Sequence, residues 1–402
     1  METAEEVHFD PYDPRVTEDP YPFYALLRAH APVYRNEERD FWALSRHADV
    51  VRAWVDEARY SSANGNSIEP VSWGPNAHKY ASLLAMDPPM HTRVRRAVTG
   101  FFGSRGIARL QPAVHTLVHS LLQELRGRDS AGSLNSFDFI RDFADRLPMR
   151  VLCLLMGVEE RDHARLQALA DAQVRRDPGA HDAPVRAIEA TLELIAYFDE
   201  LVRRRRHRPC EDLVSHLLAP APGEQRVTGE EIVAFLNTLA AAGNDTVIQL
   251  LGNAWYWASR HPAQRRRALD GDIEGWVEET LRFDPPNRFA ARTLVEDTVL
   301  HGVAVPAGAR ILLLPGSANR DPAAFPDPHR YDLSRKSPDK VSFGAGRHRC
   351  LGARLARLEA RVALGAMAGL VADYEVDESA AERVTAAEAR GFLSLPTVVR
   401  WR

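Results

Sequence analysis

One long apolar segment, from Thr228 to Trp257, restricts the fold of this chain more than any other feature. Thr228 and Glu231 have the spacing of a capping box, in which the two residues satisfy each other's free backbone N–H groups at the start of a helix. We expect the longest helix of the chain to begin here. Its middle contains Gly243 to Thr246 (GNDT). Glycine and a buried carboxylate both destabilise an apolar helix, so this local inconsistency indicates a function.

The rest of the chain is predicted to be mainly helical, with a minor β part. Apolar residues recur every three or four positions in Tyr21–Ala29, Arg46–Val55, His91–Phe102, Val114–Leu125, Phe139–Met156, Ala187–Val202 and Leu351–Leu370. Short β-branched runs between Thr293 and Leu314 predict small antiparallel strands, and FLSLPTVVRW predicts a final strand pair. Pro220 to Gly223 reads as a loop. Strands do not alternate with helices along the chain, so a doubly wound sheet is not expected. We expect a single domain over residues 1–402.

Charge and cysteine content exclude several classes of protein. The formal net charge is −4 with mixed signs along the chain, so nucleic acid is not an expected partner. Arg203 to Arg206 is interpreted as a solvated helix end, with a lipid or nucleic-acid patch as the alternative. No two of Cys153, Cys210 and Cys350 are close enough in sequence to form a C-x-x-C motif, and disulfides are not expected. Neither a signal peptide nor a membrane span is apparent, so we expect a cytoplasmic protein.

The segment FGAGRHRCLG, residues 343–352, carries the clearest chemical signal. Its glycines let the backbone turn and approach a flat ligand. A cysteine at the N-terminus of a helix is near backbone N–H groups, and these should lower the pKa of Cys350 and make it available as a thiolate. The alternative is that Cys350 is a small buried filler, the usual role of an isolated cysteine. The surrounding glycines favour the ligand role.

This segment resembles the haem loop of the cytochrome P450 family, F-G-x-G-x-x-x-C-x-G, and every fixed position matches. AAGNDT (241–246), EETLR (278–282) and FPDPHRYD (325–332) also resemble family motifs, in the family's order and spacing. The resemblance spans nearly the whole chain. It implies the cytochrome P450 fold, with haem b between the long helix and the cysteine loop. Phe343, Gly344 and Gly352 would shape the loop, and Cys350 would bind the iron.

The resemblance also assigns roles to residues outside the loop. Asp245 and Thr246, beside a helix distortion, would supply the protons that dioxygen chemistry requires. Glu279 and Arg282 lie three apart on one helical face, and Arg330 would join them to hold the haem loop. His91 and Arg95 share a helical face where they could meet a carboxylate. Together with Arg292 and His348, they would bind the haem propionates.

For the substrate pocket, the resemblance indicates mostly apolar positions. These positions lie in the loop 61–84, in residues 289–291 and 392–395, and on the long helix. The loop could also gate substrate entry. The individual candidates are Leu239, Ala242, Phe289, Ala290 and Phe392. The aromatic residues among them could equally belong to the core.

The expected reaction is insertion of one oxygen atom of O₂ into a small organic substrate. No dinucleotide-binding motif or iron–sulfur cysteine cluster is present, so electrons should come from a ferredoxin and its reductase. Arg347, Arg349 and Arg354 could receive an acidic carrier, or could be ordinary surface charges. The alternatives are a peroxide-driven peroxygenase, which the Asp245 and Thr246 pair disfavours, a haem-dependent sensor, and a helical binding module with an inert cysteine.

Overall fold

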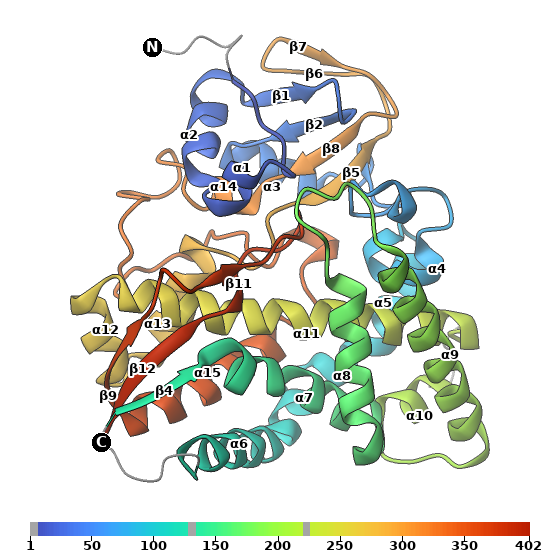
Figure 1. The fold of residues 1–402 in the computed structure, drawn as a ribbon. Coiled ribbons are helices and arrows are strands. Elements are labelled where there is room, and N and C mark those ends of the chain that lie inside the picture. Colours follow the sequence, from blue (N-terminus) through green and yellow to red (C-terminus); the bar gives the residue numbers. More distant parts are fainter. Residues whose placement is uncertain (1–6, 128–133, 220–225) are drawn as a thin grey trace.

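The computed structural model describes residues 7–127, 134–219 and 226–402, and the predicted loop Pro220–Gly223 lies outside these ranges. The fold is mainly α with a small β part, as predicted (Figure 1). The helices are α1 (Pro14–Glu18), α2 (Tyr21–His30), α3 (His47–Val55), α4 (His78–Ala81), α5 (Met90–Phe102), α6 (Ser104–Gly127), α7 (Pro148–Met156), α8 (Glu160–Val174), α9 (Val185–His207), α10 (Leu213–Leu218), α11 (Gly229–Ser259), α12 (Pro262–Leu269), α13 (Ile273–Phe283), α14 (Pro315–Ala318) and α15 (Ala353–Leu370).

The strands form small sheets around this helical body. One sheet has the order β1 (Val33–Asn36), β2 (Phe41–Leu44), β8 (Arg310–Leu313), β5 (Ala290–Leu294) and β3 (Tyr60–Ser61), and β2 and β8 are parallel neighbours within it. A second sheet has the order β4 (Leu134–Asp138), β12 (Pro396–Trp401) and β9 (Val371–Val376). Two hairpins complete the set, β6 (Thr298–Leu300) with β7 (Val303–Val305) and β10 (Glu382–Arg383) with β11 (Phe392–Ser394).

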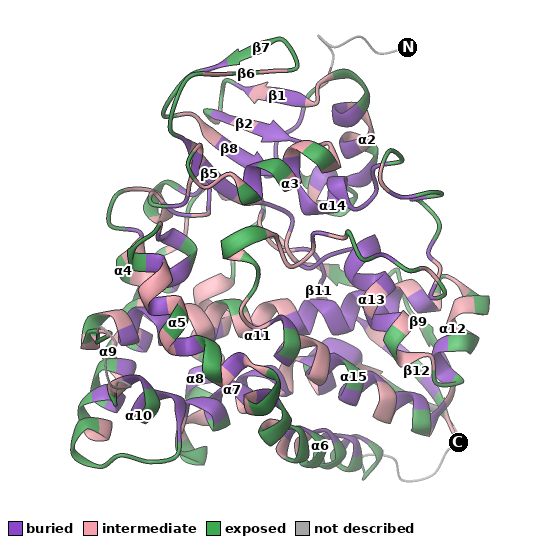
Figure 2. Cartoon of the chain, turned by 180° about the vertical axis from the view of Figure 1, so that it is seen from behind, coloured by how far each residue is buried: buried purple, intermediate pink, exposed green. Residues whose placement is uncertain are grey.

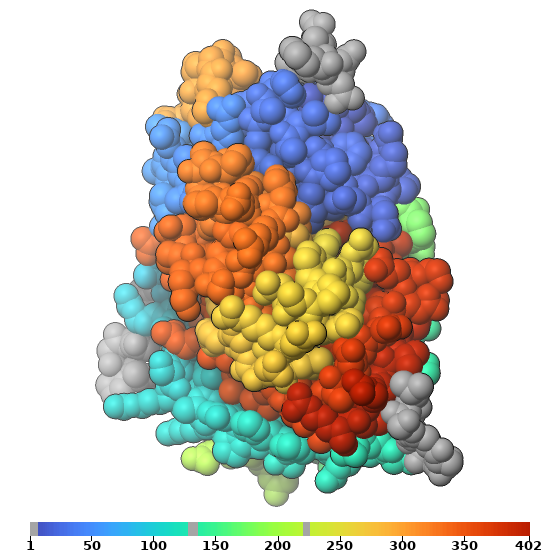
Figure 3. Space-filling model, turned by 90° about the vertical axis from the view of Figure 1, so that its left-hand side faces the viewer, coloured from blue at the N-terminus to red at the C-terminus, as the bar shows by residue number. Residues whose placement is uncertain are grey.

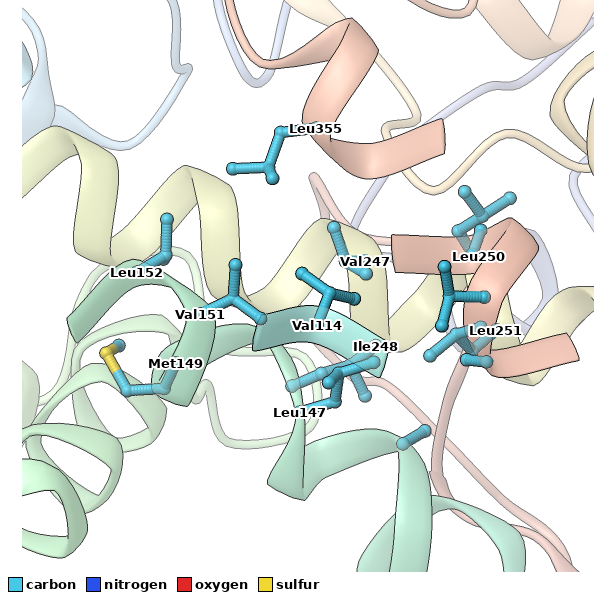
Figure 4. Packing of buried hydrophobic residues seen from close by; sticks show 14 of the residues in the cluster. Val114, Leu147, Met149, Val151, Leu152, Val247, Ile248, Leu250, Leu251 and Leu355 are labelled. Carbon is cyan, nitrogen blue, oxygen red and sulfur yellow. The ribbon is translucent and has the colours of Figure 1, made fainter. Parts of the chain in front are cut away.

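Helix α11 crosses the centre of the molecule, between the helices below it and the sheet above (Figure 1). The predicted capping box is present at its start: Thr228 accepts a hydrogen bond from the Glu231 N–H at 3.2 Å, and Glu231 accepts one from the Thr228 N–H at 2.8 Å. Val247, Ile248, Leu250 and Leu251 belong to one buried apolar cluster that also includes residues of α7, Val114 of α6 and Leu355 of α15 (Figure 4). Burial of these apolar surfaces holds α11 in place.

Two predictions of secondary structure are wrong. Phe139–Met156 is not one helix: a π turn (Phe139–Phe143) and a 3₁₀ turn (Ala144–Arg146) precede α7. Pro148, which has no backbone N–H, occupies the first position of α7, where that group is not needed. The C-terminal strands β11 and β12 both exist, but β11 pairs with β10 while β12 pairs with β4 and β9.

Segments that are distant in the sequence lie side by side on the molecular surface. On the face shown in Figure 3, the N-terminal part (blue) lies beside the part that follows α13 (orange), with α6 (cyan) at the bottom. Buried residues concentrate along α11, α13 and α15, while the outer side of α6 is exposed (Figure 2). Within residues 7–127, 134–219 and 226–402, every helix is too short or too polar to cross a membrane.

Candidate haem-thiolate site

The cysteine loop turns back on itself before α15 begins. Cys350 N–H donates to the Phe343 carbonyl at 2.8 Å, which closes the loop. Gly344 and Gly346 have φ values of +65° and +61°. A Cβ on Gly346 would lie 2.9 Å from the Trp54 carbonyl oxygen of α3, so only glycine fits there. The loop is therefore held against α3, and Cys350 is a free cysteine with exposed surface.

Two further loop residues have different local roles. Gly352 is the N-cap of α15, and a Cβ there would meet no heavy atom within 4 Å. The Phe343 ring lies under the Arg357 guanidinium, whose Cζ is 4.6 Å from the ring centroid.

The pKa of Cys350 departs from the sequence-based expectation. Cys350 keeps exposed surface, yet protein atoms surround the thiol closely enough that burial raises its pKa above the ordinary value. The N–H groups of Gly352 and Ala353 and the charges of Arg95 and Arg357 act in the opposite direction, as predicted for a helix N-terminus. In the protein alone the burial effect is larger, so the expected lowered pKa is wrong. A bound metal ion would reverse the balance, because a coordinated thiol loses its proton.

The four residues predicted to bind propionates lie around one spot, although they come from three different elements. His91 and Arg95 are on α5, Arg292 is on β5, and His348 is in the 3₁₀ turn Gly346–His348 before the cysteine. The imidazole centroids of His91 and His348 are 4.4 Å apart. Arg95 donates to the Arg349 carbonyl at 2.6 Å.

This cation group, which has Asp87 as a neighbouring carboxylate, leaves hydrogen-bonding atoms without partners. His91 is fully buried, and neither of its ring nitrogens has a hydrogen-bond partner. Burial lowers the pKa of His91 to about 4, that of His348 to about 2 and that of Arg292 to about 10, and neighbouring cations deepen the shift for both histidines. Buried polar groups are normally satisfied, so orphaned nitrogens beside two arginines indicate an anionic ligand. The two propionates of haem meet this requirement, and the donor set fits the group.

Asp245 and Thr246 both line a cavity of about 790 Å³ beside α11. Thr246 Oγ1 donates to the Ala242 carbonyl at 2.7 Å, within an uninterrupted helix, so the expected helix distortion is absent from the described α11. Burial raises the pKa of Asp245, and Gln249 donates to its Oδ1 at 3.0 Å. Gln249 also accepts from the Phe392 N–H at 2.7 Å, so it fixes Asp245 relative to β11.

Two carboxylates that the sequence analysis missed line the same cavity. Asp145 and Asp171 are joined by Gln167, which donates to the first at 3.1 Å and to the second at 2.8 Å. Burial and the proximity of neighbouring carboxylates, Asp245 among them, raise the pKa of Asp145 to about 6 and that of Asp171 to about 7. Both residues occur in helical sequence with no distinctive spacing, so no sequence signal marked them.

The predicted pocket residues divide between the cavity and the core. Ala242, Phe392 and several residues of the loop 61–84 line the cavity. Phe289 is not among the residues that line it and is buried in the N-terminal core cluster, the alternative role that the sequence left open. Ala290 and Leu239 also lie outside the cavity lining, packed against other core clusters.

The predicted Glu279 and Arg282 pair is present and fully buried. Arg282 donates to both Glu279 oxygens at 2.9 and 2.7 Å and to the carbonyls of Asn319 and Pro328. The predicted third member is wrong. Arg330 contributes only its backbone carbonyl, and its side chain is 65% exposed and pairs with Asp332. The guanidinium that reaches Glu279 belongs to Arg335, whose side chain is 13% exposed.

Comparison with known proteins agrees with this geometry. The cytochrome P450 family model matches residues 273–396. The Mycobacterium tuberculosis (strain ATCC 25618 / H37Rv) protein with the name cytochrome P450 123 is 46% identical over 99% of this chain and 98% of its own length. Cytochrome P450 monooxygenase PikC of Streptomyces venezuelae is 35% identical, over 96% of this chain and 91% of its own. The structure of cytochrome P450 CYP109Q5 from Chondromyces apiculatus superposes with a TM-score of 0.88, at 30% identity, over 98% of this chain and 99% of that one.

The fold and the cysteine loop therefore define an oxidoreductase of the haem-thiolate class. The chain belongs to the cytochrome P450 family, whose members bind haem through a cysteine thiolate.

Proposed function

We propose that this protein is a monooxygenase that binds haem b through Cys350 and inserts one oxygen atom of O₂ into a small organic substrate. The overall reaction consumes two electrons and two protons and releases the second oxygen atom as water. The observation that carries the proposal is the placement of Cys350 beside a buried cation group in which neither ring nitrogen of His91 has a hydrogen-bond partner. Asp245 and Thr246 line a separate part of the structure, the cavity beside α11. When bound, thiolate-ligated haem supplies the activation and cleavage of dioxygen.

In this proposal the residues of the chain divide the remaining work. His91, Arg95, Arg292 and His348 hold the propionates. Asp245 holds a proton at its carboxyl group, which its raised pKa favours, and Thr246 presents its hydroxyl to the reacting oxygen. Asp145 and Asp171 extend the line of carboxyl groups away from α11 along the cavity wall. Their pKa values, near 6 and 7, suit proton exchange at neutral pH.

The charge of the cavity also restricts the substrate. Carboxylates outnumber guanidinium groups among the described residues that line it, and Arg176 is already paired with Glu69. Asp145 and Asp171, whose pKa values lie near neutrality, are partly ionised at pH 7, and an anionic substrate would have to bind beside these charges. We therefore expect a neutral or cationic substrate with an apolar body that contacts Ile188, Leu192 and other apolar residues of the lining.

This expectation is tested with compounds of one alkyl chain length that carry an alcohol, a carboxylate or a trimethylammonium group. The trimethylammonium group has no free electron pair, so it leaves the haem iron unligated. Binding is followed by the change in ferric spin state. We expect the carboxylate to bind at least about tenfold more weakly than the other two compounds. Tighter binding of the carboxylate would contradict the charge argument.

We assign electron delivery to a ferredoxin, reduced by its own reductase, which docks on the cysteine side of the molecule. A groove of about 720 Å³ lies between α6 and α15 there, and His115, His119, Arg354 and Arg361 line it. None of the described lining residues is a carboxylate. Arg347 is paired with Glu57, and Arg361 of the groove is paired with Glu274, so both contribute less free charge. An acidic carrier protein would complement this groove.

The decisive test of the reaction compares electron sources. Purified haem-loaded protein is supplied either with ferredoxin, reductase, NAD(P)H and O₂, or with hydrogen peroxide alone. We expect product from the first mixture at a kcat well above that from peroxide. Turnover with peroxide alone would indicate a peroxygenase, and haem binding without any turnover across a compound panel would indicate a sensor.

A further inference from the structure

Asp87 and Ser62 form a small hydrogen-bonded link beside the cation group. The Ser62 N–H donates to Asp87 Oδ1 at 2.8 Å, and the Ser61 hydroxyl donates to Asp87 Oδ2 at 2.5 Å. The Ser62 hydroxyl lies 3.2 Å from Nε2 of His348. Ser62 is fully buried. The link thus connects the end of β3 to the loop that carries Cys350.

Asp87 also stands at the start of α5. Its carbonyl oxygen accepts the His91 N–H at 3.0 Å, so one residue contacts both the helix that carries His91 and the strand that leads to Ser62. Its carboxylate attracts the charge of Arg292 and favours the protonated form of His91. Asp87 is therefore an anion built into the edge of a group that is otherwise cationic.

The two imidazoles depend on this link for their placement. Neither ring nitrogen of His91 has a hydrogen-bond partner, and its ring packs against that of His348. The ring of His348 is held in turn by the Ser62 hydroxyl. Loss of that hydroxyl would leave both rings positioned by packing alone, and an imidazole that is free to turn binds a carboxylate less well.

We propose that Ser62 and Asp87 are positioning residues for haem: Ser62 orients His348 toward the propionates, and Asp87 holds Ser62 in place while its charge lowers the reduction potential of the iron. This inference rests on the proposed function, because it requires haem at Cys350. Both residues act through neighbours rather than on the reacting atoms.

The two halves of the proposal predict different effects. Ser62→Ala removes the contact with His348 but keeps the backbone N–H that donates to Asp87, so we expect haem to leave about five- to tenfold faster with little change in potential. Asp87→Asn keeps the shape and the acceptor oxygen but removes a negative charge. We expect the ratio of ferrous to ferric protein at a fixed electrode potential to rise up to about tenfold, which corresponds to 59 mV for one electron.

The experiment uses the haem-loaded protein and two measurements, the rate of haem transfer to apomyoglobin and the midpoint potential from spectroelectrochemistry. Ser67→Ala is the matched control, since Ser67 is a buried serine of the same loop whose hydroxyl accepts from the Glu69 N–H. A merely structural role for Asp87 would speed haem loss in Asp87→Asn without moving the potential, and would overturn the charge half of the proposal.

If Ser62→Ala lost haem at the wild-type rate, the positioning role of Ser62 would be wrong. This variant still tests that role if Asp87→Asn does not fold. Failure of the wild-type protein to hold haem through a thiolate would instead overturn the proposed function, so the two failures are distinguishable.

Discussion

Arg335 Nε lies 3.4 Å from Oε1 of Glu279, although 56 residues separate them in the sequence. Glu279 is fully buried with Arg282, and Arg335 joins this pair across the loop that precedes the cysteine. Buried ion pairs are strongly destabilised when one partner is removed, because an uncompensated charge remains in the interior.

We therefore expect Arg335→Ala to lower the free energy of unfolding by about 1 to 3 kcal/mol, less than the 3 to 5 kcal/mol typical of a fully buried partner, because the contact is long and Arg282 remains. The matched control is Arg330→Ala, whose exposed side chain should contribute less than about 0.5 kcal/mol. Urea unfolding of the two variants gives the comparison. If Arg330→Ala lost more unfolding free energy than Arg335→Ala, Arg330 would be the partner of Glu279, as the sequence predicted.

Removal of the Thr246 hydroxyl should separate electron consumption from product formation. In Thr246→Ala we expect haem content to stay at the wild-type level, kcat for product to fall roughly 10²-fold, and NAD(P)H oxidation to continue with release of hydrogen peroxide. The measurement is product and peroxide formed per NAD(P)H consumed. Thr116→Ala is the control, because Thr116 makes the same bond to the carbonyl four residues earlier but on exposed α6. Unchanged coupling in Thr246→Ala would contradict the assigned role.

Asp171 should make stability depend on pH. Burial first, and then Asp145, raise the pKa of Asp171 to about 7, so ionising it disfavours the folded state. The penalty is absent below its ordinary pKa near 3.8, grows as the pH rises, and is complete above about 7. Asp171→Asn removes the penalty.

The unfolding free energy of Asp171→Asn should thus exceed that of the wild type by an amount on the order of 1 to 3 kcal/mol at pH 8, and the difference should vanish toward pH 4. Urea titrations across this range measure it, with the exposed Asp199→Asn as control. A difference that does not vary with pH would contradict the raised pKa.

Reversal of charge in the groove between α6 and α15 should affect electron transfer alone. We expect Arg354→Glu to raise the apparent KM for ferredoxin about tenfold or more, with a steeper effect at low ionic strength. Haem content and substrate-induced spin shifts should not change, because Arg354 is exposed on the outer side of α15. Equal KM values for the variant and the wild type would exclude this groove as the docking site.

The sequence predicted the parts of the molecule whose local pattern is strong. The capping box at Thr228 and the periodicity of α11 and α15 are properties of neighbouring residues, and both helices formed as expected. The glycines around Cys350 marked the loop because its backbone geometry requires them. His91 and Arg95 share a helix face, so their proximity also followed from their spacing.

What the sequence did not predict depends on contacts between distant segments. Arg335 rather than Arg330 reaches Glu279 because of the path of an irregular loop, for which spacing gives no rule. Asp145 and Asp171 meet Asp245 only after three helical segments pack together. The pKa of Cys350 was misjudged because the helix N-terminus is a local effect, whereas burial comes from the whole fold.

The central claim is that the thiolate of Cys350 binds haem iron. The most direct measurement is the carbon monoxide difference spectrum of the dithionite-reduced protein, compared for the wild type, Cys350→Ala and the matched control Cys210→Ala, which alters an exposed cysteine. The account predicts the red-shifted Soret band of a thiolate-ligated haem in the wild type and in Cys210→Ala, and its loss in Cys350→Ala. A red-shifted band that survives in Cys350→Ala, or its absence from haem-loaded wild-type protein, would contradict the account.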